Sequence, residues 1–206
     1  MDKKQVYNEI LRIAKSIARS KKGALFIIAQ KEKFKGLYET LYPQLFKENS
    51  LNIKGIDKVI EKLATLDGAI LISDNGKLIA FGAKLKKSKP VIGFGTKHAA
   101  ASGTTEYIKK STAVLVSEEL NWIKIFQNGK IIMEMDPNTE TPIPLANKIA
   151  AFLSNRDTAL LTAAGVSTAI LGFAPTIIIG GTYLTVKTAA GIIKKQFKFK
   201  EKEREE

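Results

Sequence analysis

Cysteine is absent from this sequence, and histidine occurs only once among its 206 residues, at position 98. The absence of cysteine excludes disulfide bonds, thiolate nucleophiles and zinc sites built on sulfur ligands. A single histidine likewise excludes a metal site with several imidazole ligands. Any metal ion must therefore bind mainly to carboxylates, which suits hard cations such as Mg²⁺ or Mn²⁺.

Acidic residues are outnumbered, because 20 Asp and Glu stand against 33 Lys and Arg, for a formal net charge of +13. Such an excess favours anionic partners: nucleotides, nucleic acid or an acidic membrane surface. The basic residues are dispersed along the chain, and aromatic residues are sparse among them. Because no stacking platform for single strands is evident, nucleic acid is not the expected partner.

The N-terminal residues lack the apolar core of a secretory signal, so a cytoplasmic location is expected. Residues 3–22 instead carry apolar side chains at three- and four-residue steps, which predicts an amphipathic helix over the first 22 residues. Gly23 is the expected C-cap of this helix.

Strands and helices alternate from residue 23 to residue 136, which predicts one α/β domain with a mixed sheet. Asp74-Asn75-Gly76 and Asn128-Gly129 predict two hairpin turns. The predicted strands are 23–30, 67–73, 78–85, 111–119 and the two arms of 122–135. Helices are predicted over 55–66 and from residue 95 to about residue 110, and a short helix with loops over 31–55.

The composition changes after this domain. Residues 137–144 are rich in Pro and Thr and predict a linker, and residues 145–206 form an apolar region with a basic tail. No charge occurs over the 29 residues 158–186, and a membrane span needs about 20. A glycine and a proline interrupt this stretch, which predicts an apolar helical hairpin. The hairpin either contacts a membrane through residues 158–193 or packs as a soluble helical pair.

The stretch GTKHAAASGTTE, residues 95–106, holds the only histidine at the start of a predicted helix. A helix N-terminus offers unpaired N–H groups and a partial positive charge, which together attract anions. We expect Thr96 to cap this end, Lys97 to add a charge and His98 to add a directional donor. The small residues that follow would let a bulky ligand approach the backbone. The alternative is a solvent-facing helix start with an incidental basic pair.

Two further motifs place carboxylates at strand ends. In Asp67-Gly68-Ala69 the aspartate is a candidate metal ligand, and the glycine would let a ribose or phosphate come close. The alternative is an ordinary corner in which glycine adopts a positive φ. Ser117-Glu118-Glu119 ends a very apolar strand, where carboxylates often face a ligand crevice. Alternatively, these residues only make a loop soluble.

Taken in order, the three motifs strongly resemble those of the diadenylate cyclase domain family, which makes cyclic di-AMP. The resemblance covers about residues 23–135 and includes GALFII, residues 23–28, which is similar to the opening strand of that domain. It implies a mixed-sheet diadenylate cyclase-like fold and a homo-oligomer in which two ATP molecules meet face to face between subunits. Each 3′-hydroxyl then attacks the other α-phosphate and releases pyrophosphate.

The resemblance also implies roles for individual residues. Asp67 and Glu119 would bind Mg²⁺ or Mn²⁺, Asp67 would activate the hydroxyl, and these two with His98 are the candidate catalytic residues. Leu85 occupies the position that lines the adenine pocket. The candidate ATP-binding residues are Gly68, Ala69, Leu85, Gly95, Thr96, Lys97, His98, Ser117 and Glu118.

One departure from the family pattern concerns the phosphate-binding motif. The family's Arg-His-Arg is Lys97-His98-Ala99 here. Lys97 keeps the positive charge of the first arginine but loses its planar, bidentate hydrogen bonding to phosphate, and Ala99 loses the charge of the second arginine altogether. Losing a charged phosphate contact costs about 1.5–3 kcal/mol, or about tenfold to a hundredfold in rate. Two alternatives stay open: a nucleotide-binding regulatory relative that has lost turnover, and a basic membrane-surface or nucleic-acid interaction protein.

Overall fold

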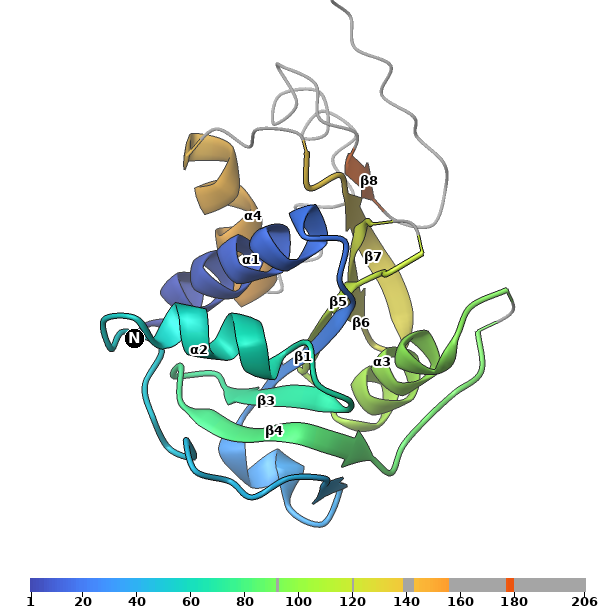
Figure 1. Cartoon of the computed structure of the whole chain (residues 1–206). Coiled ribbons are helices and arrows are strands. Elements are labelled where there is room, and N and C mark those ends of the chain that lie inside the picture. Colours follow the sequence, from blue (N-terminus) through green and yellow to red (C-terminus); the bar gives the residue numbers. More distant parts are fainter. Residues whose placement is uncertain (92, 120, 139–142, 156–176, 180–206) are drawn as a thin grey trace, which may run out of the picture.

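The computed structural model describes residues 1–91, 93–119, 121–138, 143–155 and 177–179. Among them, eight strands form one mixed sheet in the order β2-β4-β3-β1-β5-β6-β7-β8 (Figure 1). β1 is parallel to β3, and the other neighbouring strands are antiparallel. The elements are α1 (Lys3–Arg19), β1 (Ala24–Ala29), the 3₁₀ helix η1 (Lys31–Phe34), β2 (Tyr38–Thr40), α2 (Ile56–Leu63), β3 (Ala69–Ser73), β4 (Leu78–Leu85), α3 (Thr96–Tyr107), β5 (Thr112–Val116), β6 (Ile123–Gln127), β7 (Lys130–Met135), α4 (Ile143–Asn155) and β8 (Ile177–Ile179). The mixed α/β fold is therefore confirmed.

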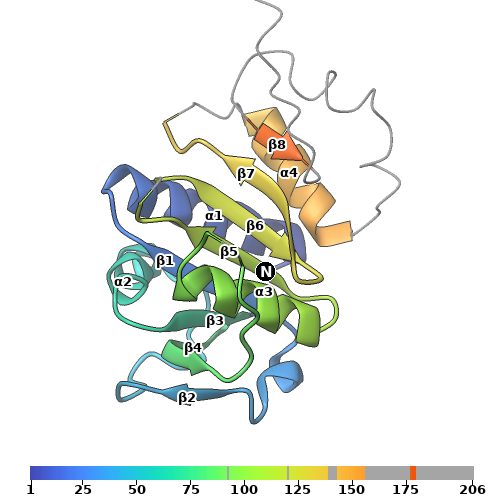
Figure 2. The same ribbon diagram turned by 90° about the vertical axis from the view of Figure 1, so that its right-hand side faces the viewer.

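Helices cover both faces of the sheet, as Figure 2 shows with α3 on one side and α1 on the other. Phe26 and Ile28 of β1 belong to the hydrophobic cluster that includes α1, α2 and α4. Leu25 and Ile27 belong to the cluster that includes α3. Because both faces of β1 are covered, all six of its residues are buried, which explains the continuous apolar run in the sequence.

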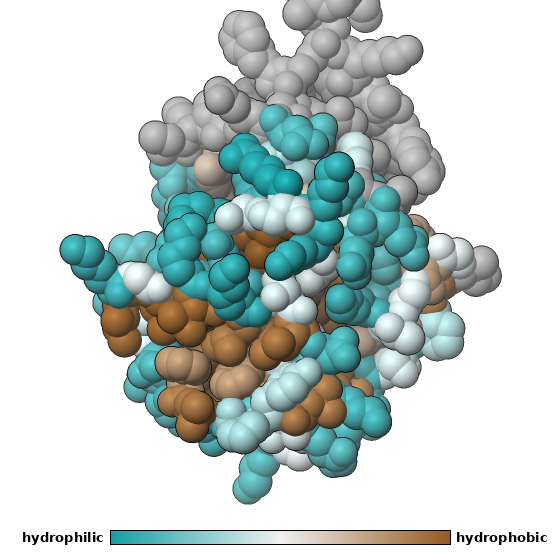
Figure 3. All heavy atoms as spheres, viewed as in Figure 1, coloured by the Kyte–Doolittle hydropathy of each residue, from teal (hydrophilic) through white to brown (hydrophobic). Residues whose placement is uncertain are grey.

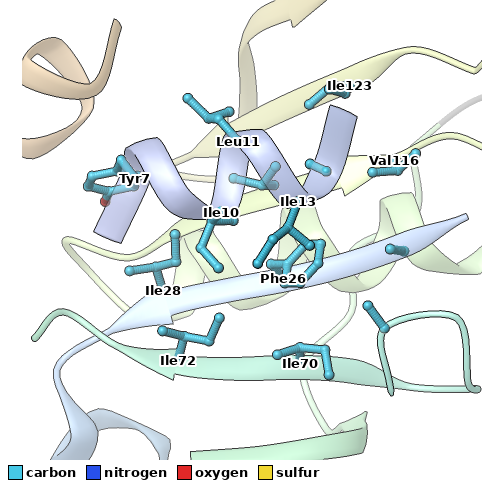
Figure 4. Close-up of a cluster of buried hydrophobic side chains, with 14 of the residues drawn as sticks. Tyr7, Ile10, Leu11, Ile13, Phe26, Ile28, Ile70, Ile72, Val116 and Ile123 are labelled. Atoms are coloured by element: carbon cyan, nitrogen blue, oxygen red, sulfur yellow. The ribbon is translucent and has the colours of Figure 1, made fainter. Parts of the chain in front are cut away.

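The N-terminal helix α1 lies across the middle of the sheet and contributes to the same core (Figure 4). Asp2 and Gln5 form a capping box at its start. The helix ends at Arg19 with Ser20 as its C-cap, and Lys21 takes the positive φ of 54°. The expectation that Gly23 ends this helix is therefore wrong, because the chain has already turned when it reaches β1.

Several element boundaries differ from those predicted. β2 was not predicted, because Glu39 and Thr40 are exposed and this short edge strand has no apolar alternation. α3 ends at Tyr107, before the predicted end at about residue 110. α4 begins at Ile143, inside the segment predicted as a linker, of which residues 139–142 lie outside the described residues.

The predicted C-terminal hairpin over residues 158–193 lies largely outside the described residues. Within it, residues 177–179 form β8, an edge strand paired with β7, so a strand replaces the predicted helix for these three residues. No helix in the described part of the chain has both the length and the apolar character needed to cross a membrane.

Hydrophobic residues gather over α2 and the segment before it (Figure 3). Ile56 and Ile60 are buried as the periodicity of 55–66 predicts, whereas Leu66 is 37% exposed. The reason is that α2 ends at Leu63, so Leu66 no longer follows the buried side of the helix. Leu66 therefore lies exposed directly before the Asp-Gly-Ala motif.

Two glycines bring β3 and β4 together where that motif begins. Gly68 has φ of 93° and Gly82 has φ of 55°. A Cβ on Gly68 would lie 2.5 Å from the carbonyl carbon of Gly82, and a Cβ on Gly82 would overlap the ring of Tyr42. The backbone of the motif thus needs glycine both for its φ and for its contact with β4.

We expect Gly68→Ala to lower the free energy of unfolding by at least about 3 kcal/mol, since left-handed backbone strain is joined by a backbone clash. The matched control is Gly36→Ala, whose φ of 74° is similar but whose Cβ would meet no atom within 4 Å. That control should lose about 1–2 kcal/mol. Equal losses in urea unfolding would contradict the packing role of Gly68.

Candidate active site

The strand register brings the three motifs to one edge of the sheet. β1 and β3 run parallel with Phe26 beside Ile70, so Gly23 is level with Asp67. β5 runs antiparallel to β1 with Val116 beside Ala24, which places Ser117 next to Gly23. Segments that are far apart in the sequence therefore end side by side.

β4 and α3 complete this edge. Ala83 of β4 pairs with Ala69, so the strand ends at Leu85 level with the Asp-Gly-Ala motif. Leu85 is half-buried against the hydrophobic cluster on the α3 side of the sheet. The N-terminus of α3 reaches the same edge, because Lys97 contacts Glu118, which follows β5. The structure thus brings the predicted residues of all three motifs to one region.

The start of α3 differs in detail from the prediction. Gly95 is the N-cap, its backbone is extended, and no side chain caps the helix. The expectation that Thr96 caps it is wrong, because Thr96 is already the first helical residue. No side chain therefore occupies the backbone N–H groups of this first turn, and such groups at a helix N-terminus can bind an anion.

Lys97 forms a long ion pair with Glu118 next to Gly23. Its Nζ lies 4.0 Å from Oε2 of Glu118, and the two side chains are 36% and 70% exposed. Such an exposed pair contributes little stability, so Lys97 remains available to another anion. A Cβ on Gly23 would come within 3.0 Å of Lys97 Nζ and 3.1 Å of Glu118 Oε2. Gly23 therefore leaves the space that both side chains occupy, a role that the sequence analysis missed.

His98, the residue after Lys97, is buried, with 7% of its surface exposed. Its imidazole stacks on Phe94 with 4.4 Å between ring centroids and an interplanar angle of 28°, and meets Phe126 edge-on at 6.2 Å. Its Nε2 is buried and has no hydrogen-bond partner among the described residues. An unsatisfied buried polar atom of this kind points to a partner that the chain alone does not supply.

The pKa of His98 is lowered from 6.5 to about 4, first by burial and then by the positive charge of Lys124, against an opposing effect of Glu134. The imidazole is therefore neutral near pH 7. In this chain the positive charge of the motif comes from Lys97 and the helix N-terminus, whereas His98 supplies a neutral polar group.

Lys124 is a second residue that the sequence analysis missed. It lies on β6 and is 3% exposed, and its Nζ bonds Oε1 of Glu134 at 2.8 Å across the β6–β7 pair. The same Nζ lies 4.4 Å from the centre of the Phe94 ring. The signal in the sequence is a lysine between two apolar residues of a strand, facing a glutamate across the Asn128-Gly129 hairpin.

The candidate metal ligands are exposed carboxylates. Asp67 and Glu119 are both exposed, and neither has a side-chain hydrogen bond or ion pair to another described residue. The described residues contain no group of three acidic, histidine or cysteine side chains that could hold a metal ion. This donor set fits Mg²⁺ or Mn²⁺, because such ions are commonly bound by one or two carboxylates together with phosphate oxygens and water.

The serine of the third motif is buried, in contrast to the glutamates after it. Ser117 is 4% exposed, and its backbone N–H donates to the carbonyl of Trp122 at 2.9 Å. This bond closes the connection between β5 and β6 and directs Glu118 and Glu119 away from the core, where both are exposed. A cavity of about 320 Å³ at the opposite edge, by Gln30 and Ser73, includes none of the predicted residues.

Comparisons with known proteins identify the family of this chain. The model of the family DAC, described as DisA bacterial checkpoint controller nucleotide-binding, matches residues 12–131, more than half of the chain. The match begins inside α1, whereas the resemblance in the sequence was placed from residue 23.

Two curated relatives bear the name diadenylate cyclase. The one from Methanocaldococcus jannaschii is 29% identical over 147 residues, which cover 65% of this chain and 46% of the relative. The one from Haloferax volcanii is 29% identical over 121 residues, covering 56% and 45%. The chain thus spans less than half the length of each of these relatives.

Two solved structures share the fold. DacA from Staphylococcus aureus, in the form of a double cysteine mutant, superposes with a TM-score of 0.51 at 18% identity, over 73% of this chain and 96% of that one. A hypothetical membrane spanning protein from Bacillus cereus superposes with a TM-score of 0.50 at 23% identity, over 59% of each chain. These likenesses concern the fold alone, whereas the family model and the ordered motifs concern descent. The chain belongs to the DAC family, the diadenylate cyclase domain family that its three motifs resemble.

Proposed function

We propose that this chain is a diadenylate cyclase, a nucleotidyltransferase that condenses two ATP molecules into cyclic di-AMP and two pyrophosphates. The observation that carries the proposal is the convergence of three motifs, in the family's order, at one sheet edge. A cation, a helix N-terminus and free carboxylates meet there, and phosphoryl transfer depends chiefly on such positioning and charge neutralisation. The net charge of +13 also favours encounter with ATP.

In this proposal the triphosphate lies at the start of α3. Gly95 and Thr96 offer backbone N–H groups, Lys97 pairs with phosphate oxygens, and His98 offers its ring nitrogen. Leu85 contacts the adenine, while Gly68 and Ala69 let the ribose approach the end of β3. Ser117 and Glu118 close the opposite side of the nucleotide.

The reaction consists of two equivalent displacements. The 3′-hydroxyl oxygen of one ATP forms a bond to the α-phosphorus of the other, the bond from that phosphorus to pyrophosphate breaks, and Asp67 accepts the hydroxyl proton. The second displacement closes the ring. Asp67 and Glu119 would hold Mg²⁺ or Mn²⁺, which would supply charge neutralisation at the phosphate and the leaving group.

The proposal includes two copies of the chain with their sites face to face. One copy offers a single phosphate cradle on an open sheet edge, whereas the product contains two equivalent linkages. A two-fold symmetric pair supplies two identical half-sites through one self-complementary contact. We propose that this homodimer acts in the cytoplasm, with the apolar residues 158–193 as a candidate membrane contact.

A second candidate function is a catalytically weakened, nucleotide-binding regulator. Its support is the motif Lys97-His98-Ala99, in which only Lys97 carries a charge near pH 7, since burial and Lys124 lower the pKa of His98 to about 4. ATP binding would then persist while the transition state lacks the charges that stabilise it.

The experiment that separates these functions is incubation of the full chain with ATP and Mn²⁺ or Mg²⁺, followed by mass spectrometry of the products. Formation of cyclic di-AMP supports the cyclase. Saturable, metal-dependent ATP binding without product supports the regulator instead. Absence of both product and binding would contradict both functions.

We expect Asp67→Asn to reduce turnover by at least about a hundredfold, because the variant loses both a metal ligand and a proton acceptor. The fold should be retained, since Asp67 is an exposed turn residue. The matched control is Asp74→Asn, which makes the same change in the turn after β3 at the opposite edge. Native rates of product formation by Asp67→Asn would show that the assignment of Asp67 is wrong.

We expect Ala99→Arg to tighten ATP binding or raise turnover by about tenfold to a hundredfold, since it restores a charged phosphate contact at the first turn of α3. Tyr107→Arg is the control, because it adds the same charge at the exposed end of that helix. Steady-state kinetics of product formation measure the effect. Loss of activity in Ala99→Arg alone would mean that the phosphates are bound differently.

A further inference from the structure

Lys124 is the one Lys, Arg, Asp or Glu side chain that is buried among the described residues. Placing a cation inside a protein is costly unless it is paired and hydrogen-bonded. Glu134 pairs with it at 2.8 Å from the directly opposite position on β7, and is itself only 20% exposed. The sheet therefore keeps an ion pair beside the loop that precedes α3, although buried ion pairs can often be replaced by apolar residues without loss of stability.

Phe94 connects this ion pair to the site. Its ring lies 4.4 Å from Lys124 Nζ and stacks at 4.4 Å on the imidazole of His98. The ring of Phe126 on β6 packs edge-on against the imidazole and restricts its rotation from a second side. The orientation of His98 is thus fixed by rings from the loop before α3 and from β6, and not by a hydrogen bond to its Nε2.

The charges around His98 come from three elements. Lys124 on β6 repels a proton on the imidazole, and Glu134 on β7 opposes this effect. On its own helix, the neighbouring Lys97 is loosely paired with Glu118 at 4.0 Å. Burial is the larger cause and Lys124 adds to it, and together they lower the pKa of His98 to about 4.

We propose that Lys124, paired with Glu134 and covered by Phe94, is a positioning residue that keeps the imidazole of His98 uncharged and stacked, so that His98 meets the bound nucleotide as a neutral hydrogen-bonding group. The link to the nucleotide rests on the proposed function, whereas the effect of Lys124 on His98 belongs to the free protein. Lys97 is then the only side-chain cation of the motif, and nucleotide affinity does not rise as the pH falls through 6.5.

The test uses the fact that His98 is the only histidine, so the Hε1 proton of its ring gives one assigned NMR signal without further labelling. The titration midpoint of this signal is measured in the full chain, in Lys124→Met and in Lys130→Met. Lys130 is an exposed lysine of the same hairpin and serves as the matched control. Lys124→Arg retains the charge and serves as the conservative variant.

We expect the native midpoint well below 6.5, near 4, with Lys130→Met and Lys124→Arg close to it. Lys124→Met should move the midpoint upward by at least about one pH unit, because a buried like charge has been removed. A native midpoint near 6.5, or an unchanged midpoint in Lys124→Met, would overturn the proposal. Should Lys124→Met fail to fold, Glu134→Gln tests the same coupling with the opposite sign, and must lower the midpoint.

Binding of ATP with Mg²⁺ at pH 5.5 and pH 8 tests the link to the nucleotide separately. Native affinity should be nearly equal at the two values, whereas Lys124→Met should bind more tightly at pH 5.5, in proportion to the fraction of His98 that its measured midpoint shows to be protonated there. Equal affinities in Lys124→Met despite a raised midpoint would overturn the role toward the nucleotide. Failure of every form to bind ATP, with the midpoints as expected, would count against the proposed function and not against the coupling of Lys124 to His98.

Discussion

The pairing of β1 with two neighbours of opposite direction determines where the whole site forms. β3 beside it is parallel and β5 is antiparallel, so the start of β1, the start of β3 and the end of β5 lie at one edge. Burial on both faces fixes this register, since a slip by one residue would exchange the two hydrophobic clusters on either side of the strand. Gly23, Asp67 and Ser117 are neighbours for that reason, although long stretches of chain separate them.

Among the described residues, the edge of the sheet carries few free cations and two unpaired carboxylates. Lys97 is loosely paired with Glu118, Lys124 is paired with Glu134 in the interior, and burial keeps His98 neutral. Asp67 and Glu119 remain exposed without a partner among the described residues. A triphosphate bound here needs a divalent cation to offset both its own charge and theirs, which agrees with the metal dependence of the proposed reaction.

Local patterns in the sequence predicted six of the eight described strands, both hairpins and the motif positions, because apolar runs and Asn-Gly turns are determined within a few residues. The features that were missed depend on contacts between distant segments. Gly23 looked like a helix end until the register placed it against Lys97 and Glu118, and β2 carries no apolar alternation of its own. The burial of Lys124 depends on a glutamate in the next strand and on a ring from a loop about thirty residues earlier. Such pairings become visible only once the sheet has been assembled.

The most direct test of the central claim, one metal–nucleotide site at this edge, is the NMR signal of the single histidine with 3′-deoxy-ATP. This nucleotide lacks the attacking hydroxyl, so it binds without reacting. Mn²⁺ is paramagnetic and broadens signals of nuclei close to it. The account predicts that Mn²⁺ and 3′-deoxy-ATP together broaden the His98 signal, that Mg²⁺ with the nucleotide only shifts it, and that Asp67→Asn weakens the broadening. The account would be contradicted if the histidine signal stayed sharp while other signals of the chain showed that the protein was saturated with the Mn²⁺–nucleotide complex.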